Sequence, residues 1–467
     1  MAAARAGSFA LELVRPVASL MPSVRRADRA VPFQRRALYT GLSVAVFLVC
    51  SHVPLYGVRY GAASSGGADP LYWVRSILAS NRGTLMELGV GPVVTAGTLT
   101  QLLTASNIIR VDQRVRAERE LVDGARKVLA LAIALGEAAA SVLLGTYGPV
   151  GALGGALIVL QLVSASAVVV FLDDLFNKGY GLRGSSAVSL FSAASTCGKF
   201  WHAFSPVTVN AGRGPEFEGI VLAVVHQAVS RAGDARAVVG TLLRRHLPNA
   251  MNLFATGLVL LAAVYLEGVK MLLPLQSRDG RGRRATFPIK LLYTSTMPIV
   301  LYSAAVSALC LVSQLLHYSR LGGSVLVRLL GVWEEASHAA VPVGGLVYYV
   351  TPPASFLAAP LHALVYTALL LASCALLSQA WVVASESTPR DVARRLTDQR
   401  LALPGRRDGA TYPLLRSYIP TAAALGGLCV GALTIFADIT GVIGAGTGIM
   451  LAATAVYNLV NSVEKED

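Results

Sequence analysis

Long apolar stretches separated by short polar segments run along almost the whole chain. A helix needs about 20 mostly apolar residues to cross the hydrocarbon core of a bilayer. About ten stretches approach that length, and charged or turn-forming residues end each of them. The expected spans are residues 38–55, 85–109, 128–148, 149–172, 187–204, 253–273, 298–316, 356–384, 418–437 and 442–463. We therefore predict an all-α integral membrane protein with about ten transmembrane helices.

Composition agrees with this prediction. The 467 residues are 54% hydrophobic and 14% charged, whereas soluble proteins average about 45–50% and 25%. The five cysteines lie scattered in apolar runs, so we interpret them as small buried hydrophobes and not as a disulfide framework. The first apolar run follows five arginines and no small-residue cleavage pattern comes after it. We expect this run to be a retained span and not a removed signal peptide.

The lysines and arginines predict the orientation. With a cytosolic N-terminus and alternating spans, 29 of the 40 basic residues fall on the cytosolic side and 11 on the opposite side. This excess puts both termini in the cytosol by the positive-inside rule. The segment 199–245 goes against the rule, but long loops weigh little on topology. Within it, residues 217–231 are apolar for too short a length to span, so we predict an interfacial or loop helix there.

Two cytosolic loops, within residues 270–290 and 385–416, are strongly basic. We expect them to form no core of their own, because they contain little apolar sequence. One interpretation is that they only enforce topology or touch anionic lipid. The other is contact with a polyanion, since flexible arginines suit phosphate groups. Composition leaves both interpretations open.

The sequence offers little catalytic chemistry. It lacks the common metalloprotease, serine hydrolase, P-loop and Cys-x-x-Cys signatures, so we expect no enzyme, no cofactor and no metal site. The Gly444-Ala-Gly446-Thr-Gly448 run has no strand before it, and we interpret it as a helix-packing or helix-entry element. Glu137 is the one carboxylate expected well inside a span. An inverted-repeat secondary transporter, the main alternative class, would need several polar groups at the midplane.

The segment 69–82 is half apolar and leads into a span interrupted by glycine and proline. A half-buried segment of this kind is tolerated at membrane depth only where protein or a water-filled cavity surrounds it. It therefore indicates a pore or vestibule.

Several motifs of four or more residues, collinear over nearly the whole chain, point to one family. They include Asp69-Pro-Leu-Tyr-Trp73, Ile77-Leu-Ala-Ser-Asn81, Gly179-Tyr-Gly-Leu182, Ala203-Phe-Ser-Pro206, Glu216-Phe-Glu-Gly219, Pro288-Ile-Lys-Leu291, Pro342-Val-Gly-Gly345 and Tyr418-Ile-Pro-Thr421. With them the chain closely resembles the α subunits of eukaryotic Sec protein-conducting channels, members of the SecY family.

The resemblance implies two pseudo-symmetric halves with a plug helix and a lateral gate. The implied parts are a cytosolic amphipathic segment 1–37, a first half 38–204 with the plug at 69–82, a hinge loop 205–249 on the lumenal side, a second half 250–463 and a cytosolic tail 464–467. The lateral gate would lie between spans two and three and spans seven and eight. The implied function is translocation of secretory polypeptides across the endoplasmic reticulum membrane and lateral insertion of membrane proteins.

The resemblance also implies site residues. The pore ring would consist of Val94, Thr98, Val188, Ser192, Val300 and Leu451. The lateral gate would include Thr95, Glu137 and Ala308, and the plug Asp69, Tyr72, Trp73, Ile77 and Leu78. Ribosome contacts would come from Arg278, Arg281, Arg283, Arg284, Arg406 and Arg407. An apolar constriction blocks ions by dewetting, so the polar Thr98 and Ser192 depart from an all-aliphatic ring.

The partners implied are ribosomes with their ribosomal RNA, signal-bearing nascent polypeptides, two small single-span Sec subunits of the beta and gamma type, membrane lipid and accessory translocation factors. Contact with ribosomal RNA would decide the polyanion question for the two basic loops.

Overall fold

The computed structural model describes most of the chain. The described residues are 24–26, 31–57, 75, 77–106, 116–148, 150–182, 186–210, 215–230, 240–242, 244, 249–277, 284–319, 322, 324–336, 339–353, 356, 358–385, 387–399, 401–402 and 411–464. All structural statements below refer to these residues.

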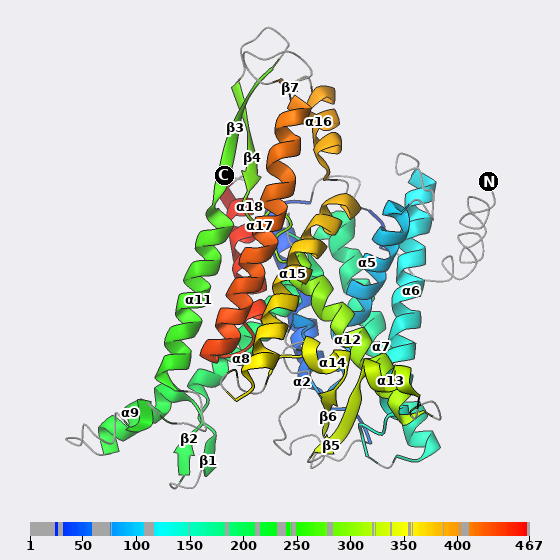
Figure 1. Ribbon diagram of the computed structural model, residues 1–467, viewed down its shortest axis with the longest axis vertical. Helices are drawn as coiled ribbons and strands as arrows, with labels where there is room; N and C mark the ends of the chain where they lie inside the picture. Colours follow the sequence, from blue (N-terminus) through cyan, green and yellow to red (C-terminus); the bar gives the residue numbers. More distant parts are fainter. Residues whose placement is uncertain are drawn as a thin grey trace.

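A long helix lies at each of the ten predicted spans. In chain order they are α2 (Phe33–His52), α5 (Gly91–Ala105), α6 (Arg116–Leu143), α7 (Ala152–Leu175), α8 (Ala187–Trp201), α11 (Ala250–Gly268), α12 (Met297–Tyr318), α15 (Pro360–Ala384), α17 (Thr411–Thr440) and α18 (Gly446–Glu464). They run along the long axis of the molecule (Figure 1). By length and composition, five helices of the described part could cross a membrane, namely those that contain α7, α11, α12, α15 and α17. The predicted mainly helical membrane fold is confirmed.

Several helix boundaries differ from the predicted spans, and two of these differences follow from the local sequence. The span expected from residue 85 begins only at Gly91, because residues 84–90 form turns and Pro92 fits the first turn of the helix. The span expected to reach residue 273 ends at Gly268, because strand β3 begins at Lys270. In the second case an apolar run continues from a helix into a strand, and hydropathy alone does not distinguish the two.

Short antiparallel hairpins extend from both ends of the helix bundle, which the all-helical prediction did not include. At one end lie β3 (Lys270–Ser277), β4 (Arg284–Lys290) and the short β7 (Leu401–Ala402). At the other end lie the hairpin of β1 (Thr208–Asn210) with β2 (Pro215–Phe217) and the hairpin of β5 (Val332–Ala336) with β6 (Ala339–Gly344) (Figure 1). In the long hairpin Lys270 pairs with Lys290 and Gln276 with Arg284, and Gln276 also faces Ala402 of β7.

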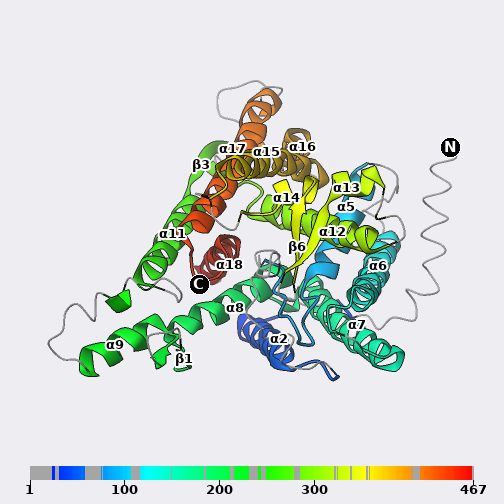
Figure 2. The same ribbon diagram turned by 60° about the horizontal axis from the view of Figure 1, so that its bottom comes forward.

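Shorter helices complete the fold. They are the π-helical turn η1 (Phe176–Tyr180), the 3-10 turn η2 (His202–Phe204), α9 (Ile220–Ser230), α13 (Val325–Leu330), α14 (Leu346–Val350) and α16 (Pro389–Asp398). Helix α9 lies in the stretch 217–231, so the predicted short helix is present there. It projects sideways from the end of the bundle (Figures 1 and 2).

The long helices form two groups that meet along two seams. Helices α2 and α5 to α8 form the first group, and α11, α12, α15, α17 and α18 form the second. Along one seam α18 packs against α8, and along the other α5 packs against α12 and α15. Figure 2, which brings the bottom of the molecule forward, shows α18 beside α8 and α5 beside α12. The largest apolar cluster contains residues of both groups.

Candidate functional site

An apolar cluster fills the centre of the molecule where the two helix groups meet. Val94 of α5, Val300 of α12 and Leu451 of α18 are 6%, 1% and 2% exposed and belong to one cluster, against which Val188 of α8 packs. Four of the six residues predicted for the pore ring are therefore brought together, although they come from four helices far apart in sequence. In this arrangement the centre is filled by aliphatic side chains, which disfavour water and ions.

The two polar residues predicted for the ring are placed differently. The Thr98 hydroxyl donates a hydrogen bond to the Thr95 carbonyl oxygen of its own helix at 3.0 Å, so its polarity is satisfied locally. Ser192 is completely buried, and its hydroxyl has no hydrogen-bond partner among the described residues. An unpartnered buried hydroxyl costs about 1–3 kcal/mol. Ser192 therefore places an unsatisfied polar group on α8 next to the apolar cluster.

The segment before α5 reaches into the same cluster. Ile77 and Leu78, both predicted plug residues, are 0% and 7% exposed and belong to the cluster that contains Val94. Only Arg75 and Ile77 of the described plug residues are helical, and turns follow them. Asp69, Tyr72 and Trp73 lie outside the described residues.

Turns hold this segment against the start of α5. The Val90 amide donates to the Leu78 carbonyl oxygen at 2.9 Å. Gly89 has φ +55°, and a Cβ atom there would lie 2.2 Å from the same carbonyl oxygen, so only glycine fits. The Asn81 side chain donates to the Ser51 carbonyl oxygen of α2 at 3.1 Å. The described part of the segment is thus attached to the start of α5 and to the end of α2, and Ile77 and Leu78 belong to the central cluster.

The residues predicted for the gate lie on α5, α6 and α12. Thr95 is partly buried and donates to the Gly91 carbonyl oxygen within α5 at 3.0 Å. Ala308 on α12 is exposed, and Glu137 on α6 is partly buried. Helix α6 packs against α5 and α7, whereas α5 makes the contacts to α12 and α15. Thr95 and Ala308 therefore lie on the two helices of this seam, whereas Glu137 lies on α6, which packs against α5.

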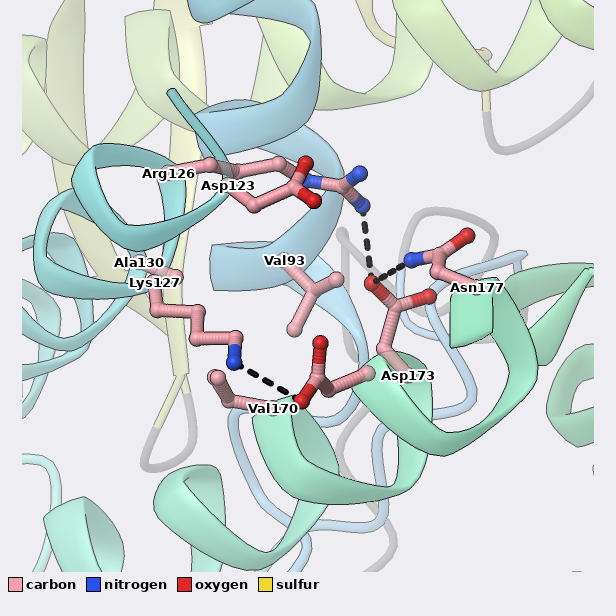
Figure 3. A pocket seen from close by; sticks show the side chains of 9 residues that line it. Val93, Asp123, Arg126, Lys127, Ala130, Val170, Asp173 and Asn177 are labelled. Atoms are coloured by element: carbon pink, nitrogen blue, oxygen red, sulfur yellow. Dashed lines mark hydrogen bonds and ion pairs between the residues drawn. The ribbon is translucent and has the colours of Figure 1, made fainter. Parts of the chain in front are cut away.

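A cluster of charges that sequence analysis missed joins α6 to α7 (Figure 3). Lys127 Nζ lies 2.8 Å from Asp174 Oδ2, and both side chains are largely buried, at 10% and 4% exposure. Arg126 Nη2 donates to Asp173 Oδ2 at 2.8 Å, and Asn177 Nδ2 donates to the same oxygen at 2.9 Å. The acidic side chains extend from the end of α7 toward the basic ones of α6, around a cavity of about 20 Å³.

The charge cluster also touches two further elements. A Cβ atom on Gly97 of α5 would lie 3.3 Å from Arg126 Nε, so the guanidinium lies against α5. The Val24 amide donates to Asp174 Oδ2 at 3.0 Å, so the chain before α2 is attached to the same carboxylate. The sequence signal was an Asp-Asp pair ending one apolar run and an Arg-Lys pair beginning another.

The expectation that the two basic loops form no core was wrong. Strands β3 and β4 and helix α16 pack against α17 around a second apolar cluster, which contains Leu275, Ile289, Val392 and Leu396. The Tyr293 hydroxyl donates to the Ser387 carbonyl oxygen at 3.1 Å and so joins the two loops. Burial raises the pKa of Tyr293 above its ordinary value, which keeps the hydroxyl as a donor. The bases of both loops are therefore one rigid unit.

Of the arginines predicted for ribosome contact, the structure describes Arg284. Arg284 is the first residue of β4. The other five, Arg278, Arg281, Arg283, Arg406 and Arg407, lie outside the described residues. They follow β3 or β7 closely in sequence, so the packed bases set where the two loops begin.

Comparison with known proteins was made on both sequence and structure. The model of the SecY family matches residues 84–460, and the plug domain of Sec61p matches residues 46–83. The chain belongs to the SecY family. The Sec61 subunit alpha of Dictyostelium discoideum is 45% identical over 98% of this chain and 96% of its own length. The corresponding subunit of Neurospora crassa is 44% identical over the same shares.

Solved structures of SecY-family channels resemble this chain along its length. A protein-conducting channel matches with a TM-score of 0.75 at 26% identity, covering 97% of this chain and 96% of the other. Sec61 in the canine ribosome–channel complex from the endoplasmic reticulum matches with a TM-score of 0.73 at 25% identity, with the same coverage of both chains. The predicted family and fold class are thereby confirmed.

The SecY-family boundaries coincide with the geometry of the site. The plug-domain match ends at Gly83, within the turns that bring Ile77 and Leu78 to the apolar cluster. The family match then begins at Thr84, ahead of α5. The residues that match the plug domain therefore end in the turns just before α5.

Proposed function

We propose that the chain is the pore-forming subunit of a protein-conducting channel in the endoplasmic reticulum membrane, with both termini in the cytosol. It would pass secretory polypeptides across the membrane and release membrane proteins sideways into the bilayer. The observation that carries the proposal is the aliphatic cluster between the two helix groups, joined by Ile77 and Leu78, in a chain of the SecY family. The relatives are named as protein transport proteins, and we propose transport and not catalysis.

In this proposal the ring is formed by Val94, Thr98, Val188, Ser192, Val300 and Leu451. The arrangement described corresponds to a shut channel, because the aliphatic ring candidates are packed against each other and against the plug. A translocating polypeptide would displace Ile77 and Leu78 and take their place among the aliphatic side chains. Such side chains adapt around an extended chain but offer ions no substitute for water.

Sideways release would use the seam between α5 and α12. Thr95, Glu137 and Ala308 are our proposed gate residues there. Thr95 and Ala308 lie on the two helices of the seam, and Glu137 lies on α6, which packs against α5. A carboxylate at membrane depth costs several kcal/mol unless it faces water or polar groups. We therefore propose that Glu137 keeps the gate partly hydrated. The inverted-repeat transporter gains no support from the comparisons.

The rigid unit of β3, β4 and α16 is our proposed docking platform for the ribosome. The two basic loops begin where its strands end, and arginine suits phosphate through bidentate hydrogen bonds. The similar canine Sec61 structure is a ribosome–channel complex, which supports ribosomal RNA as the polyanion. We further propose as partners signal-bearing nascent chains, two small single-span Sec subunits of the beta and gamma type, membrane lipid and accessory translocation factors.

Reversing the charge of the loop arginines should weaken docking. With Arg283, Arg284, Arg406 and Arg407 changed to Glu, we expect ribosome affinity to fall by at least about tenfold at low salt, and its dependence on salt to flatten, because fewer counterions are released. Binding of purified ribosomes to channel vesicles over a salt series measures both. Unchanged affinity and slope would leave these arginines as determinants of topology or lipid contact.

Removing the two ring hydroxyls should tighten the resting seal. Thr98→Val and Ser192→Ala keep nearly the same volume, so packing is preserved while the constriction becomes wholly apolar. We expect resting ion conductance in planar bilayers to fall by about twofold or more in the double variant. Ser141→Ala on α6, which removes a hydroxyl bonded within its own helix, is the matched control. Equal conductance in both variants would place Thr98 and Ser192 outside the ring.

Cross-linking tests the proposed function directly. A photoreactive amino acid at Val94 should cross-link to a stalled, signal-bearing nascent chain in microsomes, whereas the same probe at Leu160, a 65% exposed residue of α7, should not. Cross-links at neither position, with ribosomes bound, would contradict passage of the polypeptide through the centre. Cross-links at both would indicate insertion along the lipid face.

A further inference from the structure

An ion pair between a buried carboxylate and a partly exposed lysine lies at the junction between the cytosolic hairpin and the helix bundle. Glu267 is 1% exposed, near the end of α11, and Lys290 Nζ lies 3.5 Å from its Oε1 atom. Neither carboxylate oxygen of Glu267 has a hydrogen-bond partner among the described residues. Lys290 is therefore the group that offsets the charge of this buried carboxylate.

Lys290 also contacts a third element. Its Nζ atom lies 5.0 Å from the centroid of the Tyr457 ring on α18, over the face of the ring. A lysine over an aromatic ring gains an attraction that grows when water is excluded. One ammonium group thus joins α11, α18 and the last residue of β4.

The hairpin is rigidly connected to this ammonium group. Lys290 pairs with Lys270 in the β3–β4 ladder, and the Leu291 amide donates to the Val269 carbonyl oxygen at 2.9 Å. Backbone hydrogen bonds therefore run from the hairpin directly to the end of α11. A displacement of the hairpin has to move Lys290 as well.

Helix α18 carries the effect toward the centre. Tyr457 and Leu451 lie on this one helix, about 9 Å apart along its axis at 1.5 Å per residue. Near its start, a Cβ atom on Gly448 would lie 2.4 Å from the Thr196 side chain of α8, so the two helices are in close contact. Any shift of α18 therefore moves Leu451 relative to Val94 and Val300 and is passed to α8.

We propose that Lys290 is a positioning residue that couples the hairpin to the pore-ring helix α18 through the Tyr457 ring, with Glu267 fixing the ammonium group in place. The inference rests on the proposed function, since it gives the docking platform a physical connection to the ring. A ribosome docked at the loop ends would then shift the position of Leu451, although Leu451 is not part of the docking site.

The test separates docking from opening. Channels reconstituted in planar bilayers receive ribosomes that carry a stalled signal-bearing chain, and ribosome affinity and the conductance that follows binding are both measured. For Tyr457→Leu we expect ribosome affinity to stay within about twofold, while the conductance gained on binding falls by about threefold or more. Tyr265→Leu, at a 74% exposed tyrosine of the neighbouring α11, is the matched control and should behave as wild type.

Lys290 needs a second pair of variants, because Lys290→Gln alone leaves Glu267 buried without its counterion. The double variant Glu267→Gln and Lys290→Gln removes both charges and should fold, yet it should show the same loss of stimulated conductance as Tyr457→Leu. Lys290→Arg keeps the charge and the ring contact and should restore most of it.

The outcomes are distinct. Stimulated conductance equal to wild type in Tyr457→Leu and in the double variant, with ribosomes bound normally, would overturn the coupling and leave the proposed function intact. A wild-type channel that binds ribosomes and gains no conductance would overturn the proposed function, and the coupling with it.

Discussion

Asparagine at two positions of the apolar cluster, Val300→Asn with Leu451→Asn, should raise the resting ion conductance of the channel by roughly tenfold or more. Both side chains are almost completely buried in the cluster that the plug residues also enter. Asparagine has the same number and branching of side-chain heavy atoms as leucine but offers water hydrogen-bonding groups, so the dewetting that blocks ions is lost. Single-channel recordings in planar bilayers without ribosomes measure the effect.

The control for this experiment makes the same substitution at an exposed position on the outside of the helix bundle. Leu376 on α15 is 66% exposed, and Leu376→Asn makes the same substitution away from the cluster. It should leave conductance at the wild-type level. If the cluster variant also leaks no more than wild type while it remains folded, Val300 and Leu451 do not form the ion barrier.

Neutralising Asp174 should destabilise the protein strongly. In Asp174→Asn the largely buried Lys127 ammonium loses its partner at 2.8 Å, and the amide of Val24 loses an acceptor. Breaking one partner of a buried pair costs about 3–5 kcal/mol. Thermal unfolding of purified protein in detergent, followed by tryptophan fluorescence, should show a clearly lowered midpoint.

Two further variants make that result specific to the buried pair. Adding Lys127→Met removes the uncompensated charge and should restore much of the lost stability. Asp123→Asn breaks the more exposed pair between Asp123 and Lys178, 3.3 Å apart, and should cost less than about 1 kcal/mol. Similar losses for Asp123→Asn and Asp174→Asn would show that burial does not set the strength of these pairs.

The sequence predicted the long helices because each contains an apolar run that is visible in the local sequence. It missed features that depend on where a residue lies in three dimensions. The strand β3 continues the apolar run of α11, so its start at Lys270 could not be read from hydropathy. Val392 and Leu396, four residues apart on α16, did signal an amphipathic helix, but the surrounding arginines hid it in the composition of the loop.

In the site, too, local sequence patterns reveal some features, and others depend on the three-dimensional fold. The ring candidates were assigned through family resemblance, and no local pattern distinguishes Val300 from its aliphatic neighbours on α12. The Asp173 and Asp174 pair was visible, yet its partners on α6 lie almost fifty residues away and only the fold brings them within 2.8 Å. Likewise, nothing near Lys290 in sequence points to Tyr457, because their contact depends on how α18 packs.

The two seams between the helix groups differ in how extensively the groups contact each other, so one side of the molecule should open more easily than the other. At the α8 and α18 seam, Gly448 lets the two helices pack closely, and α18 also packs against α11. We therefore expect the two helix groups to stay together on this side. At the other seam α5 alone links its group to α12 and α15 among the more extensive contacts. A hydrophobic segment that leaves the channel would therefore exit at the seam of α5 with α12 and α15. Every membrane protein released by the channel would then enter the bilayer from this one side of the molecule.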